Sequence, residues 1–170
     1  MKIEPIETDR LCLRGFTPAD ADFALSIWND PEMGEYLLDE AMETVSEEYH
    51  REIERLGEDP TCCYLIAEDK ATGERIGTCS FIPAGDVYDI AYCVHKSRWR
   101  QGYATEMVAG MIGHAKNQGA KKITVVISDE NPGSNAVVKK FGFQVAETLI
   151  EKKRGSERVF TDYRYELELL

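Results

Sequence analysis

The sequence lacks the features that would place the chain in a membrane or on a nucleic acid. It contains no apolar run of about 18 residues, the length that a membrane-spanning helix needs. Lysine and arginine number 20 against 31 aspartates and glutamates, for a net charge of -11. Since nucleic-acid binding depends on basic surfaces, this balance argues against DNA or RNA as a direct partner. We therefore expect no membrane partner and no direct nucleic-acid partner.

Signals for metal binding and secretion are also missing. The three histidines lie far apart in the sequence, and the adjacent pair Cys62 and Cys63 does not have the spacing of metal ligands. Residues 1–5 are charged and interrupted by proline, unlike a signal peptide. The five cysteines are odd in number and lie mostly in strand-like runs. Reduced, buried thiols in a cytoplasmic protein without a metal are the expectation.

What is present is typical of a globular protein. A chain of 170 residues, of which 43% are hydrophobic, has the length of one domain with a sizeable core. No internal repeat, low-complexity tract or linker stands out. We expect residues 1–170 to form a single domain.

The stretch Ser97–Glu106 organises the rest of the chain. The apolar run Ile90–Val94 before it predicts a buried strand, and the apolar residues after it recur at helical spacing up to Gly119. A turn that enters a helix leaves the first backbone amides unpaired, and these amides bind phosphate together with the positive end of the helix dipole. Because Gly102 and Ala104 let a ligand approach the backbone, the pattern predicts an anion-binding cradle.

The local charge supports this prediction. Lys96, Arg98 and Arg100 cluster in an otherwise acidic chain, which is unexpected unless an anion binds nearby. A solvated basic loop is the alternative. Neither the G-x-x-x-x-G-K-[ST] phosphate loop nor the full G-x-G-x-x-G of dinucleotide folds occurs here.

The remaining elements predict a mixed sheet. A helix with Thr17 as N-cap and Pro18 at its first position should stop near Asn29. The strands before the cradle are joined by hairpin signals, and the strand after the cradle helix should run parallel to the strand before it. The expected strands are residues 10–14, 62–68, 75–82, 87–94, 122–127, 144–153 and 159–167.

A second candidate ligand-binding stretch follows the parallel strand. Asn131 can cap a helix that Pro132 starts, and Gly142 can end that helix. These structural roles would suffice for any helix. The position of this helix directly after a parallel strand indicates a ligand site as well, because the ends of parallel strands usually hold ligands.

These two stretches resemble the signatures of one enzyme family. Residues 99–106, Trp-Arg-Gln-Gly-Tyr-Ala-Thr-Glu, resemble the pyrophosphate loop of the GNAT superfamily of acetyl-CoA-dependent N-acetyltransferases, usually written R/Q-x-x-G-x-G/A, with Trp99 at its first position. Residues 131–143 resemble the second signature of the family, N-x-x-S followed by a short helix and Gly-Phe. The aromatic Trp99, with residues 7–14 and 28–31, is similar to the RimJ/RimL-type branch of ribosomal-protein N-terminal acetyltransferases.

The resemblance covers nearly the whole chain and implies both a fold and a site. The implied fold is α/β (α+β) with three layers: a mixed, mostly antiparallel sheet of about seven strands, a parallel central pair, and helices on both faces. The implied cosubstrate is acetyl-CoA, without a metal, and the implied reaction is direct attack by a primary amine in a ternary complex. The residues that the resemblance assigns to acetyl-CoA are Tyr92, Cys93, Val94, Arg98, Arg100, Gln101, Gly102, Tyr103, Ala104, Thr105, Asn131 and Ser134.

Three residues are candidates for the chemistry. The family often places a carboxylate where Asp89 lies, so Asp89 is the candidate base, acting through water, with an exposed strand carboxylate as the alternative. Ser134 is the candidate partner of the leaving thiolate, directly or by orienting a water, and its alternative is a plain first-turn serine. Tyr92 is its rival as the better proton donor, although such a tyrosine is more often part of a core. A covalent acetyl-Cys93 route is least favoured, because no histidine-activated thiolate is evident.

The acceptor has several candidates. The branch resemblance favours a protein or peptide N-terminal amine, whose pKa of about 8 demands less of a base than a lysine does. Residues 31–60 carry 11 acidic side chains against Arg51 and Arg55, which favours a small cationic amine such as a polyamine or an aminoglycoside unless this face is merely solvated. A non-catalytic acyl-CoA sensor is the alternative of another class. Both a monomer and a homodimer are compatible with the sequence.

Overall fold

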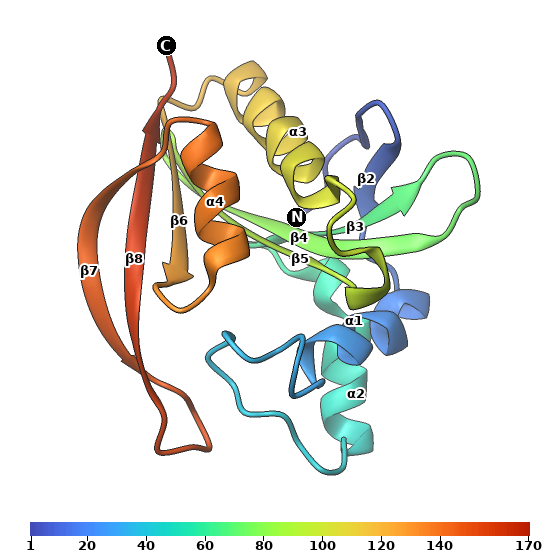
Figure 1. Ribbon diagram of the computed structural model, residues 1–170. Coiled ribbons are helices and arrows are strands. Elements are labelled where there is room, and N and C mark those ends of the chain that lie inside the picture. Colours follow the sequence, from blue (N-terminus) through green and yellow to red (C-terminus); the bar gives the residue numbers. More distant parts are fainter.

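The computed structural model describes residues 1–170 and contains one eight-stranded sheet with helices on both of its faces (Figure 1). The strand order is β1-β2-β3-β4-β5-β6-β8-β7. The strands are β1 Ile6–Glu7, β2 Leu11–Gly15, β3 Cys63–Asp69, β4 Arg75–Ala84, β5 Val87–Val94, β6 Lys122–Ser128, β7 Gln144–Lys152 and β8 Val159–Glu168. The helices are α1 Ala21–Trp28, α2 Glu47–Glu54, α3 Tyr103–Asn117 and α4 Pro132–Lys140, with the 3₁₀ turns η1 Pro18–Asp20, η2 Leu56–Glu58 and η3 Lys96–Arg98.

The sheet confirms the predicted fold. Every strand pair is antiparallel except β5 and β6, which are parallel as the strand-helix-strand order predicted. The count of eight rather than about seven arises from β1, a two-residue strand too short to leave a periodic signal. The closing hairpin is also present, although β8 and not β7 pairs with β6.

The first helix begins with a cap that was predicted at Thr17. The backbone amide of Thr17 donates to the carboxylate of Asp20 at 2.8 Å, and the chain makes one 3₁₀ turn before α1 starts. Asp20 is fully buried and accepts hydrogen bonds from Arg14 on β2 and Arg75 on β4. This buried carboxylate therefore joins the start of α1 to two strands.

Two apolar clusters define the two faces of the sheet. On one face, which we call the α3 face, Met107 and Met111 of α3 pack with Ile90 of β5 and Val138 of α4. On the other, the α1 face, α1 and α2 pack over the β3 side of the sheet, with Ile66 in a smaller cluster. No helix has the length and apolarity to span a membrane.

Strands β5 and β6 are paired over only part of their length and then diverge. Their parallel pairing covers only Val87–Asp89 against Lys122–Thr124. Beyond it, Ile90–Val94 remains paired with β4 and Val125–Ser128 with β8, so a wedge opens between the two strands. We call this wedge the splay, and Figure 1 shows the two strands diverging. It is the structural feature that positions the candidate site.

Candidate active site

The predicted anion cradle lies at one end of the splay. The chain leaves β5, makes the turn η3, and enters α3 through Arg100 and Gly102, whose φ angles are 61° and 81°. The backbone amides of residues 100–105 have no backbone acceptor, whereas the amide of Glu106 bonds to the carbonyl of Gly102. A row of free amides at the start of a 15-residue helix is the geometry that binds phosphate oxygens.

The basic side chains of the cradle are arranged differently from the prediction. Arg98 forms an ion pair with Glu74, and Lys96 forms one with Glu32 at 3.3 Å. Two members of the basic cluster are thus neutralised by carboxylates of this chain. Arg100 has no carboxylate within ion-pair distance.

A further cation at the cradle, Arg10, was not predicted. Its guanidinium stacks over the Tyr103 ring at 4.1 Å, and its Nη2 lies 3.5 Å from where a Cβ on Gly102 would stand. Glu106 fixes Arg10 through a 2.7 Å bond to Nε and a 2.8 Å bond to its backbone amide. Arg10 is 96 residues from Glu106, so no local pattern could reveal this contact.

Trp99 stands at the first position of the stretch that resembles the pyrophosphate loop, and its side chain has a structural role. Its indole Nε1 donates to the carbonyl oxygen of Val94 at 2.7 Å. The indole therefore satisfies the last carbonyl of β5 and attaches the loop to the strand. The departure from the family pattern leaves the backbone amides of the loop free.

The backbone of β5 offers alternate residues to the splay. The amide of His95 bonds to Ile76 on β4, and in an antiparallel pair successive residues point their N–H and C=O groups to opposite sides. The backbone groups of Cys93 therefore face β4, and those of Tyr92 and Val94 face the splay. The thiol of Cys93 lies near Thr78, and burial raises its pKa to about 11, so it is no thiolate at neutral pH.

The first turn of α4 lies across the splay from β5. The side chain of Asn131 accepts from the amide of Ser134 at 3.2 Å, so Asn131 is the N-cap that was predicted. The Tyr92 hydroxyl donates to the Ser134 carbonyl at 3.4 Å, and burial raises the pKa of Tyr92 to about 12. Asn135, which was not predicted, binds the carbonyls of Ser128 and Asn131 and the hydroxyl of Tyr165.

Asp89 lies where the splay begins, on the opposite face from Tyr92. Its carboxylate accepts from the hydroxyl of Thr124 at 2.7 Å. Burial raises the pKa of Asp89 above the ordinary value, and the Thr124 hydrogen bond and the charge of Arg164 limit the rise. Alternation along β5 places Tyr92 on the α3 face and Asp89 on the α1 face. The splay thus has a carboxylate on one side and the Tyr92–Ser134 pair on the other.

The segment after α1 spans the α1 side of the splay. At one end, the backbone amide of Lys96 donates to the sulfur of Met33. At the other end, the buried ammonium of Lys153 donates to the carbonyls of Gly34 and Glu35 at 3.1 and 2.8 Å. We call residues 32–39 the wall segment. It connects the turn after β5 to the β7–β8 hairpin.

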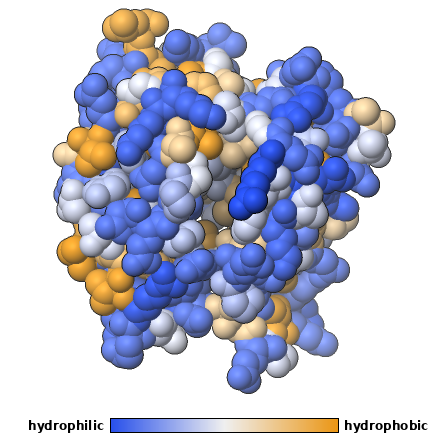
Figure 2. Space-filling model, viewed as in Figure 1, coloured by the Kyte–Doolittle hydropathy of each residue, from blue (hydrophilic) through white to orange (hydrophobic).

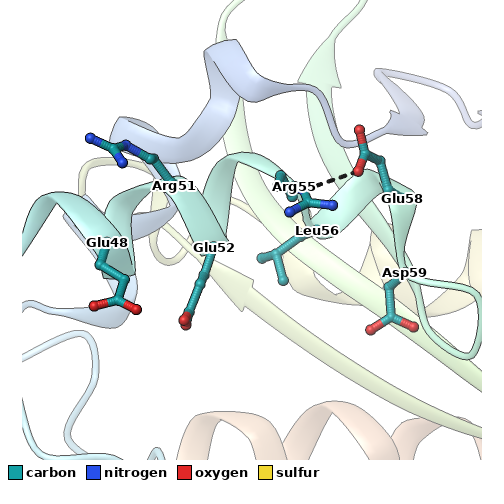
Figure 3. Close-up of a pocket in the computed structure, with 7 residues that line it drawn as sticks. All are labelled: Glu48, Arg51, Glu52, Arg55, Leu56, Glu58 and Asp59. Carbon is teal, nitrogen blue, oxygen red and sulfur yellow. Dashed lines mark hydrogen bonds and ion pairs between the residues drawn. The ribbon is translucent and has the colours of Figure 1, made fainter.

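The surface is hollowed beside this region. Figure 2 shows a depression near the middle of the molecule, below α4 as Figure 1 places it, with hydrophilic residues around most of its rim. A second hollow of about 540 Å³ lies beside α2 and is lined by Glu48, Arg51, Glu52, Arg55, Leu56, Glu58 and Asp59 (Figure 3). Because no residue of β5, β6 or α4 lines it, this second hollow is separate from the splay.

Comparison with known sequences agrees with this geometry. Residues 10–144 match the family profile described as Acetyltransferase (GNAT) domain. The chain belongs to the GNAT acetyltransferase family. It is 28% identical over 145 residues to the uncharacterized N-acetyltransferase YoaA of Bacillus subtilis, covering 82% of each chain. It is 26% identical over 171 residues to the uncharacterized N-acetyltransferase p20 of Bacillus licheniformis, covering 97% of this chain and 96% of p20.

Solved GNAT structures share the fold. A spermidine N-acetyltransferase from Vibrio cholerae, in complex with CoA and spermine, superposes with a TM-score of 0.81 at 18% identity over 94% of this chain and 95% of that one. An acetyltransferase from Salmonella typhimurium that modifies the N-terminal serine of ribosomal protein L7/L12 gives 0.79 at 16% identity over 98% of this chain and 100% of that one. At such identities the likeness is one of fold. These structures show that this GNAT protein has the family architecture.

Proposed function

We propose that residues 1–170 act as one acetyltransferase domain that transfers acetyl from acetyl-CoA to a primary amine by direct attack in a ternary complex. The observation that carries this proposal is the splay between β5 and β6, with free amides at its cradle end and Asp89 where it begins. The position of Asp89 on the α1 face and of the Tyr92–Ser134 pair on the α3 face supports this proposal. The similarity to the RimJ/RimL-type branch belongs to the same proposal.

On the donor side, unpaired backbone groups support binding of acetyl-CoA. The amides of residues 100–105 would hold the pyrophosphate, with Arg10 and Arg100 close to that turn. The backbone groups of Tyr92 and the amide of Val94 would pair with pantetheine as a strand does, since no protein strand occupies that side of β5. The donor would thus fill the splay.

On the acceptor side, Asp89 would accept the proton of the amine through a water. Only the ionised carboxylate is a base, and a raised pKa makes this base stronger at neutral pH. The bond from Thr124 keeps the carboxylate oriented toward the place where the strands part. The attacking amine would reach the thioester from the α1 face.

The leaving thiolate would lie near Tyr92 and Ser134 on the α3 face. With a pKa of about 12, the Tyr92 hydroxyl stays protonated at neutral pH and can donate a hydrogen bond to the thiolate sulfur. The Ser134 hydroxyl can donate a hydrogen bond there or orient a water. Because Asp89 and the Tyr92–Ser134 pair lie on opposite faces, the amine would attack the thioester from the α1 face and the thiolate would leave on the α3 face.

The first acceptor class that we propose is the α-amine of a protein or peptide, because it is partly neutral at physiological pH. The second is a small cationic amine. The excess of acidic side chains in residues 31–60, which number 11 against Arg51 and Arg55, favours this second class.

Release of CoA, followed with a thiol reagent, tests the proposal. Purified protein and acetyl-CoA are mixed with N-terminal peptides, polyamines, aminoglycosides and free amino acids. We expect release above the hydrolysis background with one class, and we expect Asp89→Ala and Ser134→Ala to lower turnover while CoA affinity stays nearly unchanged. Tight CoA binding without release in any mixture would favour an acyl-CoA sensor instead.

A further inference from the structure

Asp162 on β8 is a buried carboxylate without a partner. It is 6% exposed, yet no hydrogen bond or ion pair reaches its oxygens. Burial raises its pKa, and the nearby charges of Glu151 and Asp129 raise it further, with no cation opposing them. Asp20, which is fully buried, instead receives two arginines. Because no buried polar side-chain atom of this protein lacks a hydrogen-bond partner, the unpaired oxygens of Asp162 are the part of the residue that stays accessible, and a cation that reached them would meet no competing partner from the chain.

Asp162 shares a sheet face with Asp89. Asp89 pairs with Thr124 on β6, and Asp162 pairs with Ser128 on the same strand. Residues four apart on a strand, and residues directly opposite each other, lie on one face, so both carboxylates lie on the α1 face. With β6 between them, their Cα atoms are on the order of 16 Å apart, from four residues along the strand and two strand spacings across it.

The wall segment covers the surroundings of Asp162. Phe160 lies two residues before Asp162 on the same face, and its ring centroid is 6.4 Å from that of Tyr36 in the wall segment. The cations that lie nearby are bound elsewhere. Lys153 binds the carbonyls of the wall segment, and Arg158 pairs with Glu35 and Glu130. Arg164, two residues after Asp162 on the same face, pairs with Glu147 at 3.5 Å. The chain therefore places no cation of its own against Asp162.

We propose that Asp162 binds a second positive charge of the acceptor while the reacting amine lies near Asp89. This inference rests on the proposed function and names the acceptor class: an extended molecule with an ammonium or guanidinium group at some distance from the reacting nitrogen. Allowing about 3 Å for a hydrogen bond at each carboxylate leaves roughly 10 Å between the two cationic groups. A linear polyamine and a peptide with a basic side chain near its N-terminus both have this chemistry.

Matched pairs of acceptors show whether the second positive charge belongs to a linear polyamine or to a peptide with a basic side chain. One pair is spermidine against butylamine, and a longer pair is diaminodecane against decylamine. The peptide pair carries lysine or norleucine at its third position. Each is assayed with the wild-type protein, with Asp162→Asn, and with Glu47→Gln, which removes one charge from the exposed surface of α2. The KM for acetyl-CoA and the melting temperature are measured for all three proteins.

In one of the pairs, the wild-type protein should favour the member with the additional positive charge by about tenfold or more in kcat/KM, as expected for a largely buried charge pair. Asp162→Asn should abolish this preference, leave the KM for acetyl-CoA unchanged, and raise the melting temperature. A structural role for Asp162 predicts a lower melting temperature instead. The Glu47→Gln protein should behave like wild type. An equal preference in the wild type and Asp162→Asn, or no preference in the wild type, overturns the inference.

A binding measurement separates this inference from the proposed function. Isothermal titration of spermidine, of diaminodecane and of the lysine peptide into the CoA complex needs no turnover. Binding by the wild type that weakens at least tenfold in Asp162→Asn supports the cation site even if no CoA is released. Turnover with equal binding to both proteins would uphold the acetyltransferase and reject the role of Asp162. No binding of any of these probes to the wild type also rejects it.

Discussion

The hydroxyl of Tyr92 donates a hydrogen bond to the backbone carbonyl of Ser134 across the splay, at 3.4 Å. This bond is long, so the hydroxyl can turn to another acceptor without a large loss of energy. It connects the central strand to the first turn of α4, where the family signature places its serine. The bond therefore joins the Tyr92 side chain to the backbone of the turn that carries Ser134, on the α3 face.

Replacing these two side chains should identify the one that serves the thiolate. If Tyr92 donates to the sulfur, Tyr92→Phe should lower kcat by about 100-fold, and Ser134→Ala should lower it by less than about tenfold. The opposite ranking would assign the role to Ser134. The KM for acetyl-CoA is the control, since neither change removes a backbone amide of the cradle. Steady-state kinetics that leave kcat unchanged in both variants would contradict either role.

Asp89 should control the acid side of the pH profile. Its carboxyl must be ionised to act as a base, and because burial raises its pKa, kcat/KM should rise with pH through a midpoint above the ordinary pKa of about 4. Asp89→Asn should lower kcat by about 100-fold and remove this limb. If kcat/KM of the variant still rises with pH through the same midpoint, another group is responsible for that rise.

The same substitution has a predictable effect on stability. A carboxyl whose pKa is raised by folding contributes stability at acid pH, and this contribution is lost as the pH rises through the folded-state pKa. At neutral pH, Asp89→Asn should therefore leave the melting temperature unchanged or raise it. A clear decrease would mean that the Asp89–Thr124 bond is mainly structural.

Replacing Gly102 at the start of the cradle helix or Gly113 within it by alanine should have opposite effects on stability. Gly102 has a φ of 81°, so alanine would cost about 1 kcal/mol and would shift the amides that follow. We expect Gly102→Ala to raise the KM for acetyl-CoA several-fold. Gly113 lies on the exposed side of α3 with open space around it, and Gly113→Ala should add up to about 1 kcal/mol of stability without changing this KM. Equal KM values in the two variants would argue against the cradle as the donor site.

Asp20 should be a determinant of stability and not of chemistry. Asp20→Ala leaves Arg14 and Arg75 without their buried partner, which should cost about 3 kcal/mol in the free energy of unfolding. The arginines hold the pKa of Asp20 well below its usual range, so this stability is present above about pH 4 and declines as the pH falls toward the folded-state pKa. Urea unfolding at neutral and acid pH measures both effects. A stable variant with reduced activity would be the contrary result.

Much of the fold was predictable because its signals are local. The bounds of β5 match the expected strand, and Asn131 makes the expected capping bond with the amide of Ser134. Thr17 stands at the expected start, although it contacts Asp20 through its amide and hydroxyl as donors and its side chain accepts no capping bond. Parallel pairing of β5 with β6 followed from one helix between two strands. Such features depend on residues within a few positions of one another, which a single sequence displays.

The contacts that shape the site are not local. Arg10 reaches the cradle from the N-terminal hairpin, and Lys153 reaches the wall segment from the closing hairpin. The ion pair of Arg98 with Glu74 likewise depends on how the hairpin turn lies against the loop. From sequence alone, a carboxylate such as Asp162 on a predicted strand is expected to face solvent. Its burial depends on the strand pairing and on the residues that pack over it. These relationships require the tertiary structure.

The most direct test of acetyl transfer is to measure CoA release and acetylation of the primary amine in the same reaction. Mass spectrometry of the acceptor, run alongside the thiol assay for CoA, should show one acetyl group added per CoA released, with no acetylated Cys93 in the protein. The account predicts this one-to-one transfer to an amine and its loss in Asp89→Asn. CoA release without acetylated amine, or an acetylated protein intermediate, would contradict direct transfer.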